Sequence, residues 1–193
     1  MGTLMNEIES SRIYSSSELN QLGYSSNALT DLTRHNELTR LQRGFYVVGQ
    51  HDDMLSMIIQ LFPEVILCLN SALYFYGYLS ERPAVFALAV HKNHNRYRYQ
   101  HSNLPIRAYF RDDKYIDLGA SLKMYHGQLI MVYDKERTIC DCLRRKSLLS
   151  KKEYQRAIQS YLKDPDKDIE RLKNYSKILK IDKKINFLID VWY

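Results

Sequence analysis

Hydrophobic side chains in residues 15–36 recur at intervals of three and four, the spacing of helices that bury one face. Ser15 and Glu18 have the S-x-x-E spacing of a capping box, which predicts the start of one helix, and Gly23 predicts its end. Ser25 or Ser26 can cap a second helix that runs to about His35 or Asn36. The pattern therefore predicts two short helices joined by a tight turn.

The following residues change to the alternation of strands. Leu38–Gln42 and Phe45–Val48 flank the turn Arg43-Gly44, which predicts a hairpin. Upstream, residues 4–10 can form a further helix, and Arg12–Tyr14 a short strand that pairs with the hairpin. A helix, a turn, a second helix and a hairpin together predict a winged helix-turn-helix.

The polar joint Gly49-Gln50-His51 is the predicted domain boundary, which gives an N-terminal domain of residues 1–50 and a C-terminal domain of residues 51–193. Asp52 or Asp53 can cap a helix over residues 54–62, and residues 65–69 predict a brief buried segment. A third helix is predicted over residues 70–79, with Asn70 or Ser71 as its cap.

The period then changes to that of a sheet over about residues 84–133. Ala84–Val90 is an apolar run of strand length, and a polar loop over residues 91–103 separates it from a strand over residues 105–110. Two alternating runs about Gly127-Gln128 predict a hairpin. This region is predicted to be a mixed sheet of about four or five strands.

Helical spacing returns at Asp134, the predicted N-cap of a helix whose apolar stripe is Ile139, Cys140 and Leu143. Three more helices are predicted over residues 151–162, 166–179 and 182–192. The fold class is therefore α+β: an N-terminal winged helix-turn-helix, then a mixed α/β domain with a small sheet and a C-terminal helical bundle over about residues 134–192.

The charge is distributed unevenly. The chain has 28 basic and 22 acidic residues, a net charge of +6, and a pI near 9.1, which favours a polyanionic partner. Residues 1–50 carry four basic and five acidic residues, so the remaining 24 basic and 17 acidic residues leave a net charge of +7 beyond residue 50. The predicted DNA-binding module is nearly neutral, and the larger domain is basic.

Neither apolar run, Val65–Leu69 or Ala84–Val90, is long enough to span a bilayer, and the first residues do not have the pattern of a signal peptide. The three cysteines, Cys68, Cys140 and Cys142, do not suggest a disulfide framework. We expect a cytoplasmic protein without a membrane partner.

Polar side chains on the second helix and the hairpin are the candidate DNA contacts. Asn and Arg match base edges in a major groove, Ser and Thr serve bases or phosphates, and arginines at a wing tip meet phosphate or the minor groove. The alternative is an ordinary solvated helix face and hairpin. The predicted DNA-binding residues are Ser25, Ser26, Asn27, Thr30, Arg34, Arg40, Gln42 and Arg43.

The basic excess of the larger domain has two concentrations, residues 92–114 and residues 135–156. The second is dense enough to predict a surface that contacts nucleic acid or an acidic protein, although charged helices are usually only solvated. In the first, Tyr97 and Tyr99 can stack on bases or complete a strand edge. The residues of the predicted basic surface are Arg137, Arg144, Arg145, Lys146, Lys151 and Lys152.

Catalytic and metal-binding patterns are weak, and we predict no enzyme activity, metal or cofactor. His91, His94 and His101 share one loop, but arginines lie among them and no Cys or Glu completes a familiar zinc spacing. Asp112, Asp113 and Asp117 form an acidic cluster of the kind that holds Mg²⁺ in nucleotidyltransferases, but no phosphate-binding Gly-Ser motif precedes it.

Three stretches resemble the AbiEi antitoxins of bacterial abortive-infection and toxin–antitoxin systems: LNQLGYSSNALTDLTRHNELTRLQRGFYVV, CLNSALYFYGY and VYDKERTICDCLRRK. Asn36 stands where the family more usually has Gly before the wing. The signature residues of the third stretch are Glu136, Arg137, Thr138 and Asp141, and we interpret Glu136 and Asp141 as structural.

The resemblance implies that the winged helix-turn-helix binds inverted repeats upstream of its own operon as a repressor, with two copies on the DNA and a monomer in solution. It also implies that the C-terminal domain counteracts an AbiEii-like nucleotidyltransferase toxin without a stable complex, with nucleic-acid contact by that domain as a further expectation. Two alternatives stay open: a C-terminal domain that is itself a Mg²⁺-dependent nucleotidyltransferase-like enzyme, and an antitoxin that binds and plugs its toxin.

Overall fold

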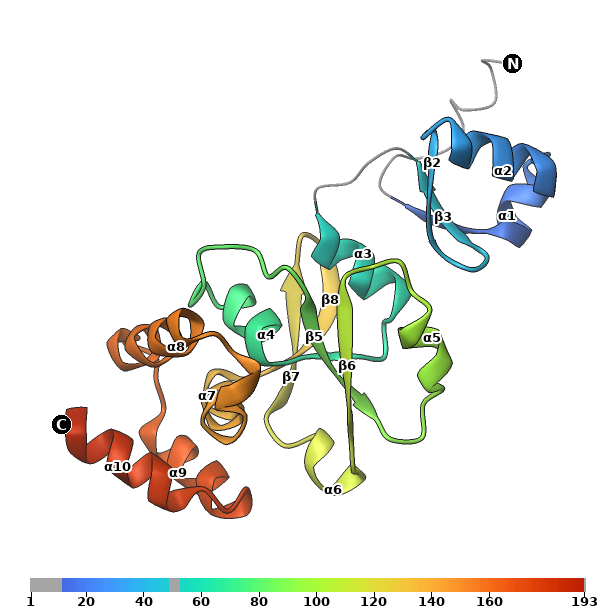
Figure 1. The fold of residues 1–193 in the computed structure, drawn as a ribbon. Helices are drawn as coiled ribbons and strands as arrows, with labels where there is room; N and C mark the ends of the chain where they lie inside the picture. Colours follow the sequence, from blue (N-terminus) through green and yellow to red (C-terminus); the bar gives the residue numbers. More distant parts are fainter. Residues whose placement is uncertain (1–11, 49–52, 193) are drawn as a thin grey trace. The chain divides into compact units, whose positions relative to one another are not determined.

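The structure is a computed structural model of the 193-residue chain, and it describes residues 12–48 and 53–192. The chain divides into two compact units (Figure 1). Unit 1 comprises Met1–Pro63 with Asn95–Pro105, and unit 2 comprises Glu64–His94 with Ile106–Tyr193. The helix predicted over residues 4–10 lies outside the described residues. The predicted α+β class, with its winged helix-turn-helix, small sheet and C-terminal helices, is confirmed.

The winged module of unit 1 follows the predicted order of elements. Strand β1 (Ile13–Ser15) leads into helix α1 (Ser16–Gln21), and helix α2 (Ser26–Arg34) precedes strands β2 (Leu38–Gln42) and β3 (Phe45–Val48). The three strands form an antiparallel sheet in the order β1-β3-β2. The predicted pairing of the first strand with the hairpin is therefore confirmed.

Short-range hydrogen bonds explain why these helices start and stop where they do. Ser15 Oγ accepts from the Glu18 amide at 3.2 Å, and a Glu18 carboxylate oxygen accepts from the Ser15 amide at 2.7 Å, which completes the capping box. Gly23 has φ of +93° in the turn that follows α1. The apolar faces close on a core of Tyr14, Leu19, Tyr24, Leu29 and Leu38.

Unit 1 also contains helix α3 (Met54–Leu61) and helix α5 (Arg96–Gln100). The α5 segment is bonded to the wing, because the Asn103 amide donates to Leu41 O at 2.7 Å and Asn103 Nδ2 donates to Arg40 O at 2.8 Å. Phe62 and Tyr99 stack with ring centroids 5.1 Å apart. In this division residues 53–63 and 95–105 group with the winged module, and the domain boundary at residues 50 and 51 stays a prediction.

Unit 2 is built on a five-stranded mixed sheet in the order β6-β5-β4-β8-β7. Its strands are β4 (Ile66–Leu67), β5 (Phe86–His91), β6 (Ile106–Arg111), β7 (Ala120–Tyr125) and β8 (Gln128–Tyr133). The pairs β5–β6 and β4–β8 are parallel, and the pairs β4–β5 and β7–β8 are antiparallel. The predicted mixed sheet is confirmed, and it gains a central strand, β4, from the stretch that was predicted only as a buried segment.

The larger helices of unit 2 gather beside the sheet around one shared core (Figure 1). Helices α4 (Leu69–Phe75) and α7 (Lys135–Arg144) contact each other, and α7 also contacts α8 (Lys151–Lys163) and α9 (Ile169–Ile178). Helix α10 (Asp182–Trp192) packs on α9. Their shared core contains Leu73, Ile139, Cys140, Tyr161 and Leu172.

Two local predictions were wrong. Asn70 and Ser71 lie inside α4 instead of capping it, because Asn70 Nδ2 donates to Val85 O and its Oδ1 accepts from the Ala87 amide. The predicted loop over residues 91–103 contains α5, which Asn95 caps through its side chain. Strand β6 ends at Arg111, and helix α6 (Asp113–Ile116) begins two residues later.

Candidate nucleic-acid interface

Helix α2 has one buried and one exposed face, as its spacing predicted. Leu29 is 3% exposed, and Ala28 and Leu32 are half-buried. Ser25 Oγ accepts from the Ala28 amide at 3.2 Å, so Ser25 is the N-cap and Ser26 the first residue of the helix. The exposed side chains on the outer turns belong to Ser26, Asn27, Thr30, Asp31 and Arg34.

Two of the outer side chains already have intramolecular partners. Thr30 Oγ1 donates to Ser26 O at 3.0 Å, and Arg34 Nη1 lies 3.3 Å from Asp31 Oδ1. Both side chains of the Arg34–Asp31 pair are well exposed, so water screens the pair and its contribution to stability is small. Arg34 can therefore exchange this partner for a phosphate or a base edge at little cost.

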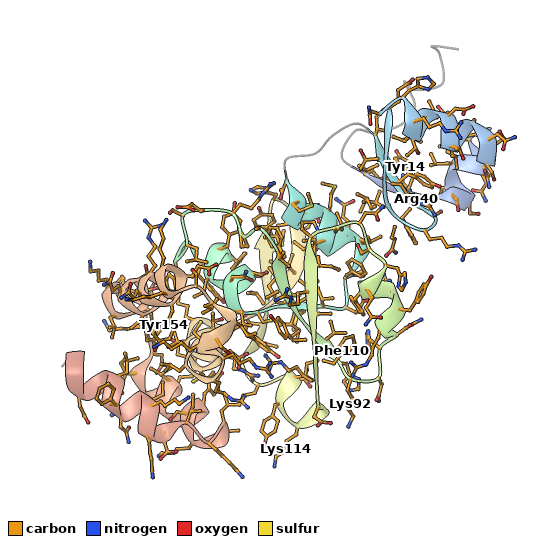
Figure 2. The ribbon with its side chains drawn as sticks, in the orientation of Figure 1. Tyr14, Arg40, Lys92, Phe110, Lys114 and Tyr154 are labelled. Atoms are coloured by element: carbon orange, nitrogen blue, oxygen red, sulfur yellow. The ribbon has the colours of Figure 1, made fainter. Side chains whose placement is uncertain are left out.

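The wing presents its arginines and buries its glutamine. Arg40 and Arg43 are exposed, and Figure 2 shows Arg40 on the wing. The register of β2 against β3 shifts between Arg40 and Gln42, and both Leu41 and Gln42 are buried. The prediction that Gln42 contacts DNA was wrong, because the bulge turns two successive side chains inward and leaves Gln42 7% exposed.

The predicted basic surface of unit 2 loses Arg137, whose side chain is completely buried. Arg137 Nη1 donates to Tyr115 O at 2.9 Å and to Leu118 O at 2.7 Å, and its guanidinium lies 4.4 Å from the centroid of the Tyr133 ring. The placement of Arg137 on a surface was therefore wrong. This arginine links α6 and the segment that follows it to the start of α7.

The other members of that basic surface reach solvent to different degrees. Arg144 has a 30% exposed side chain, and Arg145 is half-buried. Lys146 is exposed with its ammonium 4.8 Å from the centroid of the Tyr154 ring, which Figure 2 labels. Lys151 is exposed, and Lys152 pairs with Glu81 at 3.0 Å.

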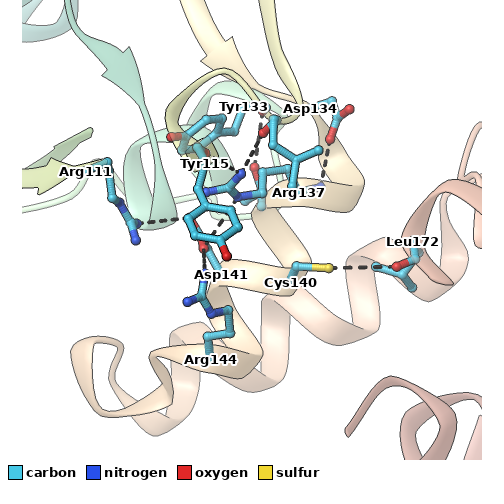
Figure 3. Close-up of polar contacts among 11 residues, drawn as sticks. Arg111, Tyr115, Tyr133, Asp134, Arg137, Cys140, Asp141, Arg144 and Leu172 are labelled. Atoms are coloured by element: carbon cyan, nitrogen blue, oxygen red, sulfur yellow. Dashed lines mark hydrogen bonds and ion pairs between the residues drawn. The ribbon is translucent and has the colours of Figure 1, made fainter. Parts of the chain in front are cut away.

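The remaining signature residues of the ERT-x-x-D stretch are structural, as interpreted for Glu136 and Asp141. Glu136 is buried and accepts from the Asp168 amide at 2.9 Å and from the Tyr161 hydroxyl at 3.2 Å. Thr138 Oγ1 donates to Tyr133 O at 3.2 Å. Asp141 is completely buried and lies 3.1 Å from Arg111, as Figure 3 shows.

The candidate metal ligands do not cluster in the described part of the chain, and two of the cysteines are protonated thiols. Among the described side chains, no three His, Cys, Asp or Glu groups are placed to hold a metal ion. Asp112 forms an ion pair with Lys92. Burial raises the pKa of the Cys68 and Cys140 thiols to about 12, so at neutral pH both are thiols rather than reactive thiolates.

Comparison with known proteins agrees with the geometry of the winged module. Residues 4–49, about a quarter of the chain, match the model of a family described as transcriptional regulator, AbiEi antitoxin. The N-terminal residues of this chain are therefore similar to the AbiEi antitoxin regulators. The match supports a regulatory role of the antitoxin class.

The fold of the whole chain also has a counterpart. It is similar to the crystal structure of the RV2827C protein from Mycobacterium tuberculosis, with a TM-score of 0.69 and 15% identity over 93% of this chain and 72% of that chain. At this identity the similarity shows the fold alone. No curated protein matches the sequence. No described helix is long and apolar enough to cross a membrane.

The sequence pattern was enough to choose α2 and the wing tip as candidate DNA contacts. It did not predict that residues 95–105 make hydrogen bonds to strand β2. Asn103 makes two hydrogen bonds to β2 from about sixty residues away, and Arg98 donates to Leu61 O. The signal in the sequence was weak: Asn95 has the spacing of a helix cap before Tyr97, but the stretch resembled a polar loop.

Proposed function

We propose that the chain is an autorepressor of an antitoxin operon, whose α2 helix and wing bind inverted-repeat DNA upstream of its own gene. The observation that carries this proposal is the exposed polar face of α2 next to a wing with two exposed arginines, in a module that matches AbiEi regulators. Two copies, monomeric in solution, occupy the two half-sites. Because the target is operator DNA, we place the protein in the cytoplasm.

The α2 face supplies the contacts that distinguish bases, and the wing supplies contacts to phosphate. Asn27 and Arg34 are the side chains suited to base edges, whereas Ser25 and Ser26 suit phosphates near the N-terminus of the helix. Thr30 suits a base or a phosphate. Arg40 and Arg43 carry charge without needing a particular base.

The test is a gel-shift assay on the upstream region with Arg34→Ala and Arg43→Ala. Each substitution is expected to weaken binding about tenfold or more, and loss of a phosphate contact should reduce the salt slope by about 0.9. Lys173→Ala on α9 of unit 2 is the control, because it removes one exposed charge outside the winged module. If both arginine variants bind operator DNA as tightly as the natural chain, then Arg34 and Arg43 do not contact the DNA.

We further propose that unit 2 counteracts a nucleotidyltransferase-type toxin by an action that needs no stable complex. The arginine variants should therefore still rescue growth when the toxin is expressed. Co-purification of toxin and antitoxin at low micromolar concentration would instead support a protein that plugs its toxin. We also propose that unit 2 has no catalytic activity, and transfer of label from NTPs with Mg²⁺ that Asp112→Ala abolishes would overturn this.

A further inference from the structure

Edge strand β6 of unit 2 carries arginine and tyrosine at alternate positions. Arg107, Tyr109 and Arg111 share one face of the strand, because successive side chains of a strand point to opposite faces. The spacing from Arg107 to Arg111 is about 13 Å along the strand. Arg107 is exposed, Tyr109 is half-buried, and Arg111 is 6% exposed.

The buried end of this face holds more positive than negative charge. Arg111, Arg137 and Arg144 place guanidinium nitrogens 3.1, 3.5 and 3.8 Å from the carboxylate of Asp141, which is completely buried (Figure 3). Asp134 also acts electrostatically on Arg137, at the start of α7. In these contacts two carboxylates thus face three guanidinium groups.

Arg145 adds a further cation beside them. Its guanidinium lies 5.7 Å from the centroid of the Tyr109 ring. Burial, and next the charge of Arg111, lower the pKa of Arg145, so the two cations are close enough to repel. No ion pair to Arg107 or Arg145 occurs among the side chains that the structure describes. Crowded cations partly withdrawn from water are disfavoured unless an anion is bound beside them.

A recess of about 210 Å³ lies beside Arg107. Arg107 and Tyr109 line it together with apolar atoms of Leu69, Val85 and Leu148. Glu153 is also on its wall, where its carboxylate accepts from the Ser150 amide at 2.7 Å. A phosphate is therefore favoured on the arginine side, away from Glu153, and the apolar wall suits a base or a sugar.

We propose that Arg107, Arg144 and Arg145, here called the arginine row, bind the phosphates of a single-stranded nucleic acid that lies along β6. Arg111 and Asp141 are positioning residues beneath the row, because both are buried, Asp141 pairs with Arg144, and Arg111 pairs with Asp141. Guanidinium groups bind phosphate through charge-assisted and often bidentate hydrogen bonds. This proposal gives the antitoxin role of unit 2 a ligand. Only the role of the site in the cell rests on the proposed function.

The test uses the full chain with Arg34→Ala and Arg43→Ala, so that the winged module contributes as little as possible. Fluorescence anisotropy measures binding of a labelled single strand of about 15 nucleotides, as RNA and as DNA, and of the matching duplex. Arg107→Gln with Arg145→Gln should weaken single-strand binding about tenfold and reduce the salt slope by about 1.4. Equal binding of RNA and DNA indicates phosphate readout, and tighter RNA binding indicates an RNA strand.

The matched control is Lys173→Gln with Lys177→Gln, which removes the same charge from exposed positions on α9. This pair should change affinity less than about twofold. An equal loss of affinity in the arginine pair and in the lysine pair would overturn the proposal. So would a chain with only Arg34→Ala and Arg43→Ala that does not bind the single strand, or that binds the duplex more tightly. If the double variant folds poorly, Arg107→Gln alone serves as the test, because Arg107 is exposed. This single variant should weaken single-strand binding about threefold.

The outcome is independent of the proposed regulatory function. With Arg34 and Arg43 intact, the Arg107→Gln and Arg145→Gln substitutions should leave operator binding within about twofold of the natural chain. A failure of operator binding in the natural chain would overturn the proposed function and leave the single-strand result standing. A failure of single-strand binding would overturn the arginine row alone.

Discussion

Asn36 ends helix α2 in a conformation that few residues adopt. Its φ is +59°, its amide donates to Thr33 O, and the Glu37 amide donates to Leu32 O, which is the hydrogen-bond pattern of a Schellman motif. Glycine has no steric penalty in this region, and asparagine is the side chain that tolerates it best. This explains why the resemblance has Gly at this position and why Asn can replace it.

We therefore expect Asn36→Ala to lower the free energy of unfolding by about 1 kcal/mol, because alanine is penalised at positive φ. Asn36→Gly should be neutral or raise it by a few tenths of a kcal/mol. Urea unfolding of the two variants measures the difference. An alanine variant as stable as the natural chain would contradict the assigned backbone conformation.

Gly119 is constrained by a neighbour as well as by its φ of +75°. A Cβ atom there would lie 2.5 Å from Arg137 Cβ. We expect Gly119→Ala to lower the free energy of unfolding by about 3 kcal/mol or more, because the buried Arg137 cannot move without losing its bonds to Tyr115 O and Leu118 O.

The matched control is Gly77→Ala. Gly77 has φ of +72° and no heavy atom within 4 Å of the added Cβ, so this variant should lose only the backbone term of about 1 kcal/mol. The two variants are compared by thermal or urea unfolding of the full chain. Equal losses would show that Arg137 does not pack against Gly119.

At the scale of elements, the capping box of α1 makes a pH-dependent contribution. The Ser15 amide, then the Ser15 hydroxyl, donate to the Glu18 carboxylate and hold the pKa of Glu18 below its ordinary value of 4.5. The stabilisation is therefore fully present above pH 4.5 and is lost as the pH falls through the lower, folded-state pKa.

Glu18→Ala should thus lower the free energy of unfolding at pH 7, and the difference from the natural chain should narrow below pH 4.5. The control is Ser25→Ala, which removes the cap of α2, a helix with no acidic residue in its first turn. That variant should lose about 1 kcal/mol at both pH values. A Glu18→Ala deficit that is unchanged between pH 7 and pH 3 would contradict the charged capping box.

Elements with local signals were predictable from the sequence, and elements fixed by distant contacts were not. Caps and turn residues gave β2, β3 and α2 correctly. Strand β4 has only two residues and was not recognisable as a strand, because its pairing with β5 and β8 depends on sequence more than twenty residues away. The burial of Arg137 depends on carbonyl groups near α6, which no helical period can reveal.

The candidate site followed the same division. Exposed residues on α2 and at the wing tip could be chosen from the helical and strand periods, because each residue's face is set within its own element. The prediction for Gln42 was wrong because a β-bulge depends on the pairing of two strands and cannot be recognised in one strand alone. The arginine row was missed in part because Arg107 and Arg145 come from separate segments that only the folded sheet brings to Tyr109.

At the scale of the whole molecule, the strands of the winged module receive hydrogen bonds from residues beyond position 50. The Ile13 amide donates to Gln60 Oε1 at 3.3 Å, and Asn103 donates twice to β2, so two later segments hold strands β1 and β2. The module also lacks excess positive charge, since residues 1–50 have a net charge of −1. Weak charge and missing supports both predict that the fragment alone binds DNA poorly.

We therefore expect the fragment of residues 1–50 to bind operator DNA at least about tenfold more weakly than the full chain in a gel-shift assay at equal salt. Asn103→Ala in the full chain separates the two causes, because it removes one hydrogen bond to Arg40 O without changing charge. It should lower the free energy of unfolding by about 1 kcal/mol and weaken operator binding less than the truncation does. Tight binding by the fragment would show that residues 95–105 are dispensable, and that the arginines of α2 and the wing supply the whole affinity.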